Sequence, residues 1–108
     1  MRKAEIKRKT KETSIELNIN LDGTGKSSIS TPFGMLTHMM EQISKHALID
    51  INLKVSGDTE TGSHHVVEDT AIVLGEAFDK ALGDRSGIEK MADSTVPLDE
   101  SLSMVAID

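Results

Sequence analysis

The sequence predicts an α+β fold in which a mostly antiparallel sheet carries two helices on one face. Segments of two-residue apolar alternation and segments of helical spacing follow one another in the order strand, strand, strand, helix, strand, helix, and then further strands. The chain has 108 residues, of which 37% are hydrophobic but only 2% aromatic. We therefore expect one domain with a modest core of Ile, Leu, Val and Met.

Three strands are expected first, at residues 4–11, 14–21 and 27–30. The second alternates cleanly, since polar residues separate Ile15, Leu17, Ile19 and Leu21. The segment DGTGK at 22–26 contains neither a GxGxxG nor a Walker pattern, so we interpret it as a hairpin turn into the third strand rather than a phosphate loop.

The first helix is expected over residues 33–48, with Thr31 as its cap and Pro32 at its first position. A strand at 49–55 follows it. The residues that have the spacing of a core face on this helix are Leu36, Met39, Met40, Ile43 and Ala47.

The second helix is expected over residues 64–82, capped by Ser63 and ended by Gly83. Beyond it, apolar residues between Leu98 and Ile107 indicate one or two more strands. The expected buried stripe of this helix consists of Val67, Ala71, Leu74, Phe78 and Leu82.

Composition excludes several classes of protein. The absence of cysteine excludes disulfides, iron–sulfur clusters and thiolate zinc sites, and no apolar run reaches the ~20 residues of a membrane span. We expect a soluble, cytoplasmic protein. Six of the twelve basic residues lie within the first eleven, so a nucleic-acid-binding arm is one hypothesis. The net charge of −6 and the scarcity of aromatic residues favour a solvated edge strand instead.

The segment GSHHVVED, residues 62–69, holds two of the four histidines. On a helical wheel with Val67 at zero, His64 falls at about 60°, Glu68 at about 100° and His65 at about 160°. All three residues therefore share one flank of the helix. Two imidazoles and a carboxylate suit Mn, Zn, Fe or Ni, whereas a polar helix start stabilised by the helix dipole explains the same residues. The wheel alone leaves both readings open.

The other two histidines lie on the first expected helix. His46 falls about 20° from Met39 and is expected to pack at the core boundary, whereas His38 falls on the polar flank, where it could face a ligand.

Four segments together resemble imidazoleglycerol-phosphate dehydratase of histidine biosynthesis, in order and at matching spacing across essentially the whole chain. They are RKTKETSIELNINLDGTGKSSIST, THMMEQISKHALID, HHVVEDTAIVLGEAFDKALGDRSGI and PLDESL. The resemblance implies a lyase that dehydrates imidazole glycerol phosphate to imidazole acetol phosphate. It also implies half of a two-repeat fold similar to domain 2 of ribosomal protein S5, with a first repeat at 1–85 and the start of a second at 86–108.

The resemblance also implies residue roles. Mn²⁺, or another divalent ion, would be bound by His38, His64, His65 and Glu68. The substrate, a small phosphorylated imidazole, would bind as a metal-bridging imidazolate. Catalysis would involve Glu12 and Asp99, and the residues contacting substrate would be Glu12, His46, Arg85 and Lys90.

The chain departs from the family pattern at three places. Thr37 stands where the family usually has Asp, Gly62 and Ser63 replace two acidic residues, and Lys90 replaces an arginine that would hold phosphate with a bidentate fork. The family consists of two similar halves that form sites between subunits of a homo-oligomer, and this chain carries one half's set of ligands. We therefore expect a truncated chain, and the alternative function is a non-catalytic metal-binding or assembly fragment of that enzyme.

Overall fold

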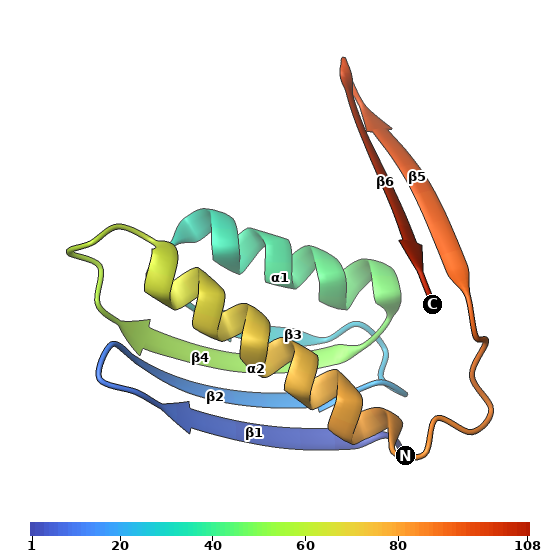
Figure 1. The fold of residues 1–108 in the computed structure, drawn as a ribbon, viewed down its shortest axis with the longest axis horizontal. Helices are drawn as coiled ribbons and strands as arrows, with labels where there is room; N and C mark the ends of the chain where they lie inside the picture. The colour runs from blue at the N-terminus through green and yellow to red at the C-terminus, as the bar shows by residue number, and fades with distance from the viewer.

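The structure is a computed structural model that describes residues 1–108. A four-stranded sheet has the strand order β1-β2-β4-β3, and two helices lie on one of its faces, while a two-stranded hairpin stands apart (Figure 1). The predicted α+β class with two helices on one face of a mostly antiparallel sheet is confirmed. The elements are β1 (Lys3–Lys9), β2 (Thr13–Asn20), β3 (Ser27–Ser30), α1 (Gly34–Ala47), β4 (Asp50–Gly57), α2 (His64–Leu82), β5 (Ala92–Leu98) and β6 (Ser101–Ile107).

The register of the central strands defines the two ends of the sheet. β2 and β4 are antiparallel, so Thr13 pairs with Gly57 at one end and Asn20 with Asp50 at the other. β3 is parallel to β4, and α1 forms the crossover between them. The expected hairpin at 22–26 was wrong, because β4 lies between β2 and β3 in the sheet. The turn 10–12, the end of β4 and the starts of both helices consequently lie at the Thr13–Gly57 end (Figure 1). We call this the histidine end.

The core lies between the sheet and the helices. α2 packs over β1 and β2, and α1 packs over β3 and β4. The alternation predicted for β2 is confirmed, because Ile15, Leu17 and Ile19 are buried and the intervening residues face the open side of the sheet. β4 contributes in the same way through its buried residues Ile51, Leu53 and Val55.

The predicted buried faces of the helices were partly wrong. In α1, Met40 and Ser44 are buried, whereas Met39 and Ile43 remain 47% and 37% exposed. In α2, Val67 is 41% exposed. The residues of α2 that do pack on the sheet are Val66, Thr70, Val73, Ala77 and Ala81.

Small residues explain this difference. Ser44, Thr70 and Ala77 let the helices lie close to the sheet, and the Ser44 hydroxyl donates to the Ile49 carbonyl at 2.7 Å. Met39, Ile43 and Val67 consequently lie on the helix flanks, while Met40, Val66 and Val73 pack on the sheet beside the small residues. The bounds predicted for α2 are confirmed, but α1 begins at Gly34 rather than after a Thr31 cap.

The hairpin of β5 and β6 has no buried residue. Its turn places Asp99 in the left-handed region, with φ of 51°. The hairpin extends away from the sheet and helices (Figure 1). An isolated two-stranded hairpin is marginally stable in water. Neither α1 nor α2 has both the length and the apolar composition needed to cross a membrane.

Candidate functional site

Three segments that are distant in sequence meet at the histidine end. The backbone N–H of Asp58, after β4, donates to the Glu12 carbonyl at 2.7 Å. The hydroxyl of Thr13, at the start of β2, donates to the Asp69 carboxylate of α2 at 2.6 Å. The fold therefore brings the turn that carries Glu12 next to the β4–α2 connection and the first turns of α2.

His64 and Glu68 are neighbours on α2, as the helical wheel predicts. The His64 Nε2 lies 2.8 Å from the Glu68 Oε2, and the two side chains are 74% and 56% exposed. A shallow cavity of about 600 Å³ is lined by Thr61, Ser63, His64, Val67 and Glu68. An imidazole nitrogen and a carboxylate oxygen are thus available together to a molecule or ion that enters from solvent.

His65 is oriented differently. Its ring centroid lies 5.7 Å from that of His64, with the ring planes 80° apart. Its Nδ1 lies 3.8 Å from an Asp58 carboxylate oxygen, and this nitrogen is buried without a hydrogen bond. Within this chain, no three His, Cys, Asp or Glu side chains converge into a group that could hold a metal ion.

Sequence reasoning missed Asp58, because the segment 56–63 reads only as a turn-rich connection. The signal available was an acidic residue a short distance before two histidines. Its contacts with both Glu12 and His65 depend on the path of the connection, which no periodicity reports.

Glu12 is exposed and held by its own turn. The Thr10 hydroxyl accepts from the Glu12 backbone N–H at 3.1 Å and donates to the Glu12 Oε2 at 3.2 Å. The Glu12 Oε1 has no hydrogen-bond partner in the chain and is free to accept a proton or a donor group. This carboxylate therefore lies at the histidine end in a defined rotamer.

The two histidines of α1 occupy different positions. His38 is exposed in the second turn, and α1 begins at the histidine end, but His38 forms no ion pair or hydrogen bond there. His46 lies near the other end of α1. The expectation that His46 packs at the core boundary was wrong, because the side chain is exposed, with its Nε2 3.0 Å from the Gln42 amide oxygen.

The structure does not bring the remaining predicted residues to the histidine end. Asp99 is in the turn of the β5–β6 hairpin. Arg85 follows α2 and forms an ion pair with Asp79. Lys90 precedes β5, and its Nζ lies 2.6 Å from the Asp108 carboxylate.

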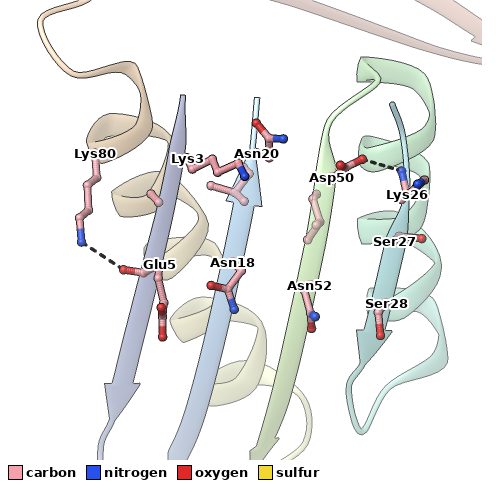
Figure 2. Close-up of a pocket in the computed structure, with 13 residues that line it drawn as sticks. Lys3, Glu5, Asn18, Asn20, Lys26, Ser27, Ser28, Asp50, Asn52 and Lys80 are labelled. Atoms are coloured by element: carbon pink, nitrogen blue, oxygen red, sulfur yellow. Dashed lines mark hydrogen bonds between the residues drawn. The ribbon is translucent and has the colours of Figure 1, made fainter. Parts of the chain in front are cut away.

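A second cavity, of about 720 Å³, lies on the open face of the sheet at the opposite end (Figure 2). It is lined by amide, hydroxyl and charged side chains, including Asn18, Asn52 and Asp50, and contains no histidine. Backbone N–H groups of Thr24 and Lys26 donate to the Asp50 carboxylate and hold its pKa below the ordinary value. This carboxylate already has its donors, so the histidine end is the stronger candidate site despite its smaller cavity.

Fold and site together define a two-layer α+β domain that presents imidazole and carboxylate groups at one end of its sheet. A family model described as imidazoleglycerol-phosphate dehydratase matches residues 31–108. The chain belongs to the imidazoleglycerol-phosphate dehydratase family.

Curated relatives support this assignment. The chain is 55% identical over 107 residues to the imidazoleglycerol-phosphate dehydratase of Bifidobacterium animalis subsp. lactis, covering 99% of this chain and 54% of the relative. It is 54% identical over 108 residues to the protein of the same name from Hydrogenobaculum sp., covering 100% and 56%. For the protein from Clostridium acetobutylicum the identity is 55% over 107 residues, covering 99% and 54%. The chain thus spans about half the length of the curated relatives it matches.

Proposed function

We propose that this chain supplies part of the active site of a cytoplasmic, metal-dependent lyase of histidine biosynthesis. The reaction is the dehydration of imidazole glycerol phosphate to imidazole acetol phosphate. The observation that carries the proposal is the meeting of the Glu12 turn with the helix that bears His64, His65 and Glu68, in a chain of this family. The names of the relatives indicate the same reaction.

The donor set fits a divalent ion such as Mn²⁺. The His64 Nε2 and the Glu68 Oε2 lie 2.8 Å apart on exposed side chains. Imidazole nitrogen and carboxylate oxygen are ligand types that Mn²⁺ and Zn²⁺ accept. Asp58 faces the Nδ1 of His65, and a carboxylate on that side favours a proton on Nδ1 and leaves Nε2 as the ligating atom. We assign His38, His64, His65 and Glu68 as ligands of ions held between chains. Because no three of these side chains converge within this chain, each ion would take part of its donors from another chain.

The remaining residues would act on the substrate. The chemistry that a divalent ion would supply here is a lower pKa of the substrate's imidazole ring, which would make the neighbouring C–H proton easier to remove. Glu12 would accept that proton at its free Oε1 and give it to the departing hydroxyl, which leaves as water. The O–H proton of the resulting enol would then move to carbon, giving the ketone. Asp99 would assist proton transfer, His46 would contact the substrate, and Arg85 and Lys90 would hold its phosphate after exchanging their present carboxylate partners.

We further propose a homo-oligomer with sites between subunits. The outer flanks of the two helices expose Met39, Ile43 and Val67, and the β5–β6 hairpin exposes all of its apolar side chains. Covering exposed large apolar side chains removes apolar area from water, which favours association through these surfaces. A second copy would cover these flanks and could supply the missing ligands.

Metal stoichiometry tests the ligand assignment. The purified chain is dialysed against Mn²⁺, free ion is removed, and bound Mn is counted by elemental analysis. We expect about one ion per chain, at least about tenfold weaker binding in Glu68→Ala, and unchanged binding in the matched control Glu76→Ala, two turns further along the exposed side of α2. Equal Mn²⁺ retention by all three chains would disprove the role of Glu68.

A second candidate function is a metal-binding or assembly fragment without turnover, and the half-length match to the relatives favours it. NMR of the substrate's ring and side-chain protons during incubation with the Mn²⁺-loaded chain distinguishes the two. Product formation that Glu12→Gln abolishes supports the enzyme. Bound Mn²⁺ without product supports the fragment.

A further inference from the structure

A single hydrogen bond joins the start of β2, directly after the turn 10–12, to α2. The Thr13 hydroxyl donates to the Asp69 Oδ2 at 2.6 Å, across 56 residues of sequence. Thr13 is buried and Asp69 is half-buried, so water competes weakly for this contact. A short hydrogen bond to a carboxylate acceptor is among the stronger kinds in proteins. The two segments that carry the candidate site residues are therefore held together by a specific contact.

The donors and acceptors around Thr10 connect this bond to Glu12. The Thr10 hydroxyl oxygen accepts from the backbone N–H groups of Glu12 and Thr13, at 3.1 and 3.0 Å, which occupies both of its lone pairs. It can then only donate, and the Glu12 Oε2 lies 3.2 Å away. The Thr13 hydroxyl oxygen also lies 3.2 Å from the Thr10 hydroxyl oxygen.

Asp69 determines the direction of this network. A carboxylate can only accept, so the single Thr13 hydroxyl proton is directed to Asp69 and not towards Thr10. The Thr13 oxygen can still accept, so the Thr10 proton has two possible acceptors, the Thr13 oxygen and the Glu12 Oε2, both 3.2 Å away. Thr13 thus contacts both the Asp69 carboxylate and the Thr10 hydroxyl that lies beside Glu12.

We propose that Thr13 and Asp69 are positioning residues that hold Glu12 in a fixed place relative to His65 and Glu68. Asp69 directly follows Glu68 in α2, so the Thr13–Asp69 bond attaches the Glu12 turn to the same helical turn that bears the proposed ligand. The Asp58 N–H bond to the Glu12 carbonyl attaches the turn to the His65 side as well. That this positioning serves catalysis rests on the proposed function. The Thr13–Asp69 hydrogen bond itself does not depend on that function.

The test uses Thr13→Val, which removes the hydroxyl at nearly constant volume and changes no charge. In the metal-free 108-residue chain we expect the amide of Asp58 to exchange about tenfold faster in Thr13→Val, while core amides such as Leu17 and Leu53 keep their protection. Thr13→Ser restores the hydroxyl and should restore the slow exchange. Asp69→Ala provides a second disrupting variant if Thr13→Val does not fold, and Asp69→Asn, which keeps an acceptor oxygen, is its matched control.

Paramagnetic broadening by Mn²⁺ gives the second readout. We expect bound Mn²⁺ to broaden the Glu12 side-chain signals in the unmodified chain and in Thr13→Ser. In Thr13→Val the broadening should be at least about twofold weaker, with unchanged Mn²⁺ affinity. Unchanged Asp58 exchange, or an equal acceleration of all amides, would overturn the positioning role. If the unmodified chain binds no Mn²⁺, the metal assignment fails, and the exchange experiment still decides on the positioning.

Discussion

Gly57 at the end of β4 gives the sharpest prediction from the structure. A Cβ built at this position would lie 2.7 Å from the Glu12 carbonyl oxygen, 3.0 Å from the Thr13 Cγ2 and 3.2 Å from the Thr13 Cα. The φ of Gly57 is not positive, so alanine could adopt its backbone conformation and only these contacts oppose it. Two of the three atoms belong to the backbone of the neighbouring segment and cannot rotate away.

The expected cost follows from the size of the overlap. One of β2 and β4 must shift by several tenths of an ångström, and overpacking of this kind costs about 1–3 kcal/mol. The same shift lengthens the 2.7 Å bond from the Asp58 N–H to the Glu12 carbonyl, a contact worth about 1 kcal/mol. We therefore expect Gly57→Ala to lower the free energy of unfolding by about 2–4 kcal/mol.

Gly75 in α2 is the matched control. A Cβ there would meet no atom within 4 Å, and alanine in a helix interior is favoured over glycine by about 1 kcal/mol. The two substitutions should therefore move urea-unfolding midpoints, followed by far-ultraviolet circular dichroism, in opposite directions. Each kcal/mol corresponds to about 4–8 °C in Tm for a domain of this size. A Gly57→Ala chain as stable as the unmodified one would refute the close approach of β4 to the Glu12 turn.

Two further predictions concern stability. Leu17 is 0% exposed on the central strand β2, so Leu17→Ala should cost about 2–5 kcal/mol in urea unfolding, whereas Leu102→Ala in the exposed hairpin should change little; equal effects would contradict the assigned core. Hydrogen bonds from the Arg2 side chain and backbone lower the pKa of Asp22 from 3.8 to about 2. Because the folded-state pKa of Asp22 lies below its unfolded value, the stabilisation is complete above about pH 4 and is lost as the pH falls towards 2. Asp22→Asn should therefore lose less stability over this range than the unmodified chain. Parallel pH profiles would count against the Arg2–Asp22 pair.

The strands and the bounds of α2 were predictable because each follows from a local pattern. Alternation in β2 directly reports which side chains share a face, since successive residues of a strand point to opposite sides. For α2, a cap-type residue before His64 and a glycine after Leu82 mark both ends. Pairing of His64 with Glu68 follows equally from i, i+4 spacing.

The buried helix faces were not predictable by choosing the largest apolar residues. That choice selects Met39 and Val67, whereas the structure buries small residues such as Ser44 and Ala77 together with Met40, Val66 and Val73. The spacing of Thr70, Ala77 and Ala81 carried this signal as a small-residue stripe. The contact of His65 with Asp58 had no such signal, because it depends on how the connection between β4 and α2 folds back.

The same feature relates the fold to the proposed assembly. Each helix packs one face on the sheet. This leaves an exposed apolar flank, which bears Met39 and Ile43 on α1 and Val67 on α2. The cavity beside His64 and Glu68 is also lined by Val67, so the uncovered apolar flank and the candidate ligands adjoin each other on α2. A subunit that covers this flank would, in the proposed function, approach the ligands directly. Burial of apolar area and completion of the metal site would then stabilise the same contact, so the ordering of the site and the assembly of subunits would be thermodynamically linked.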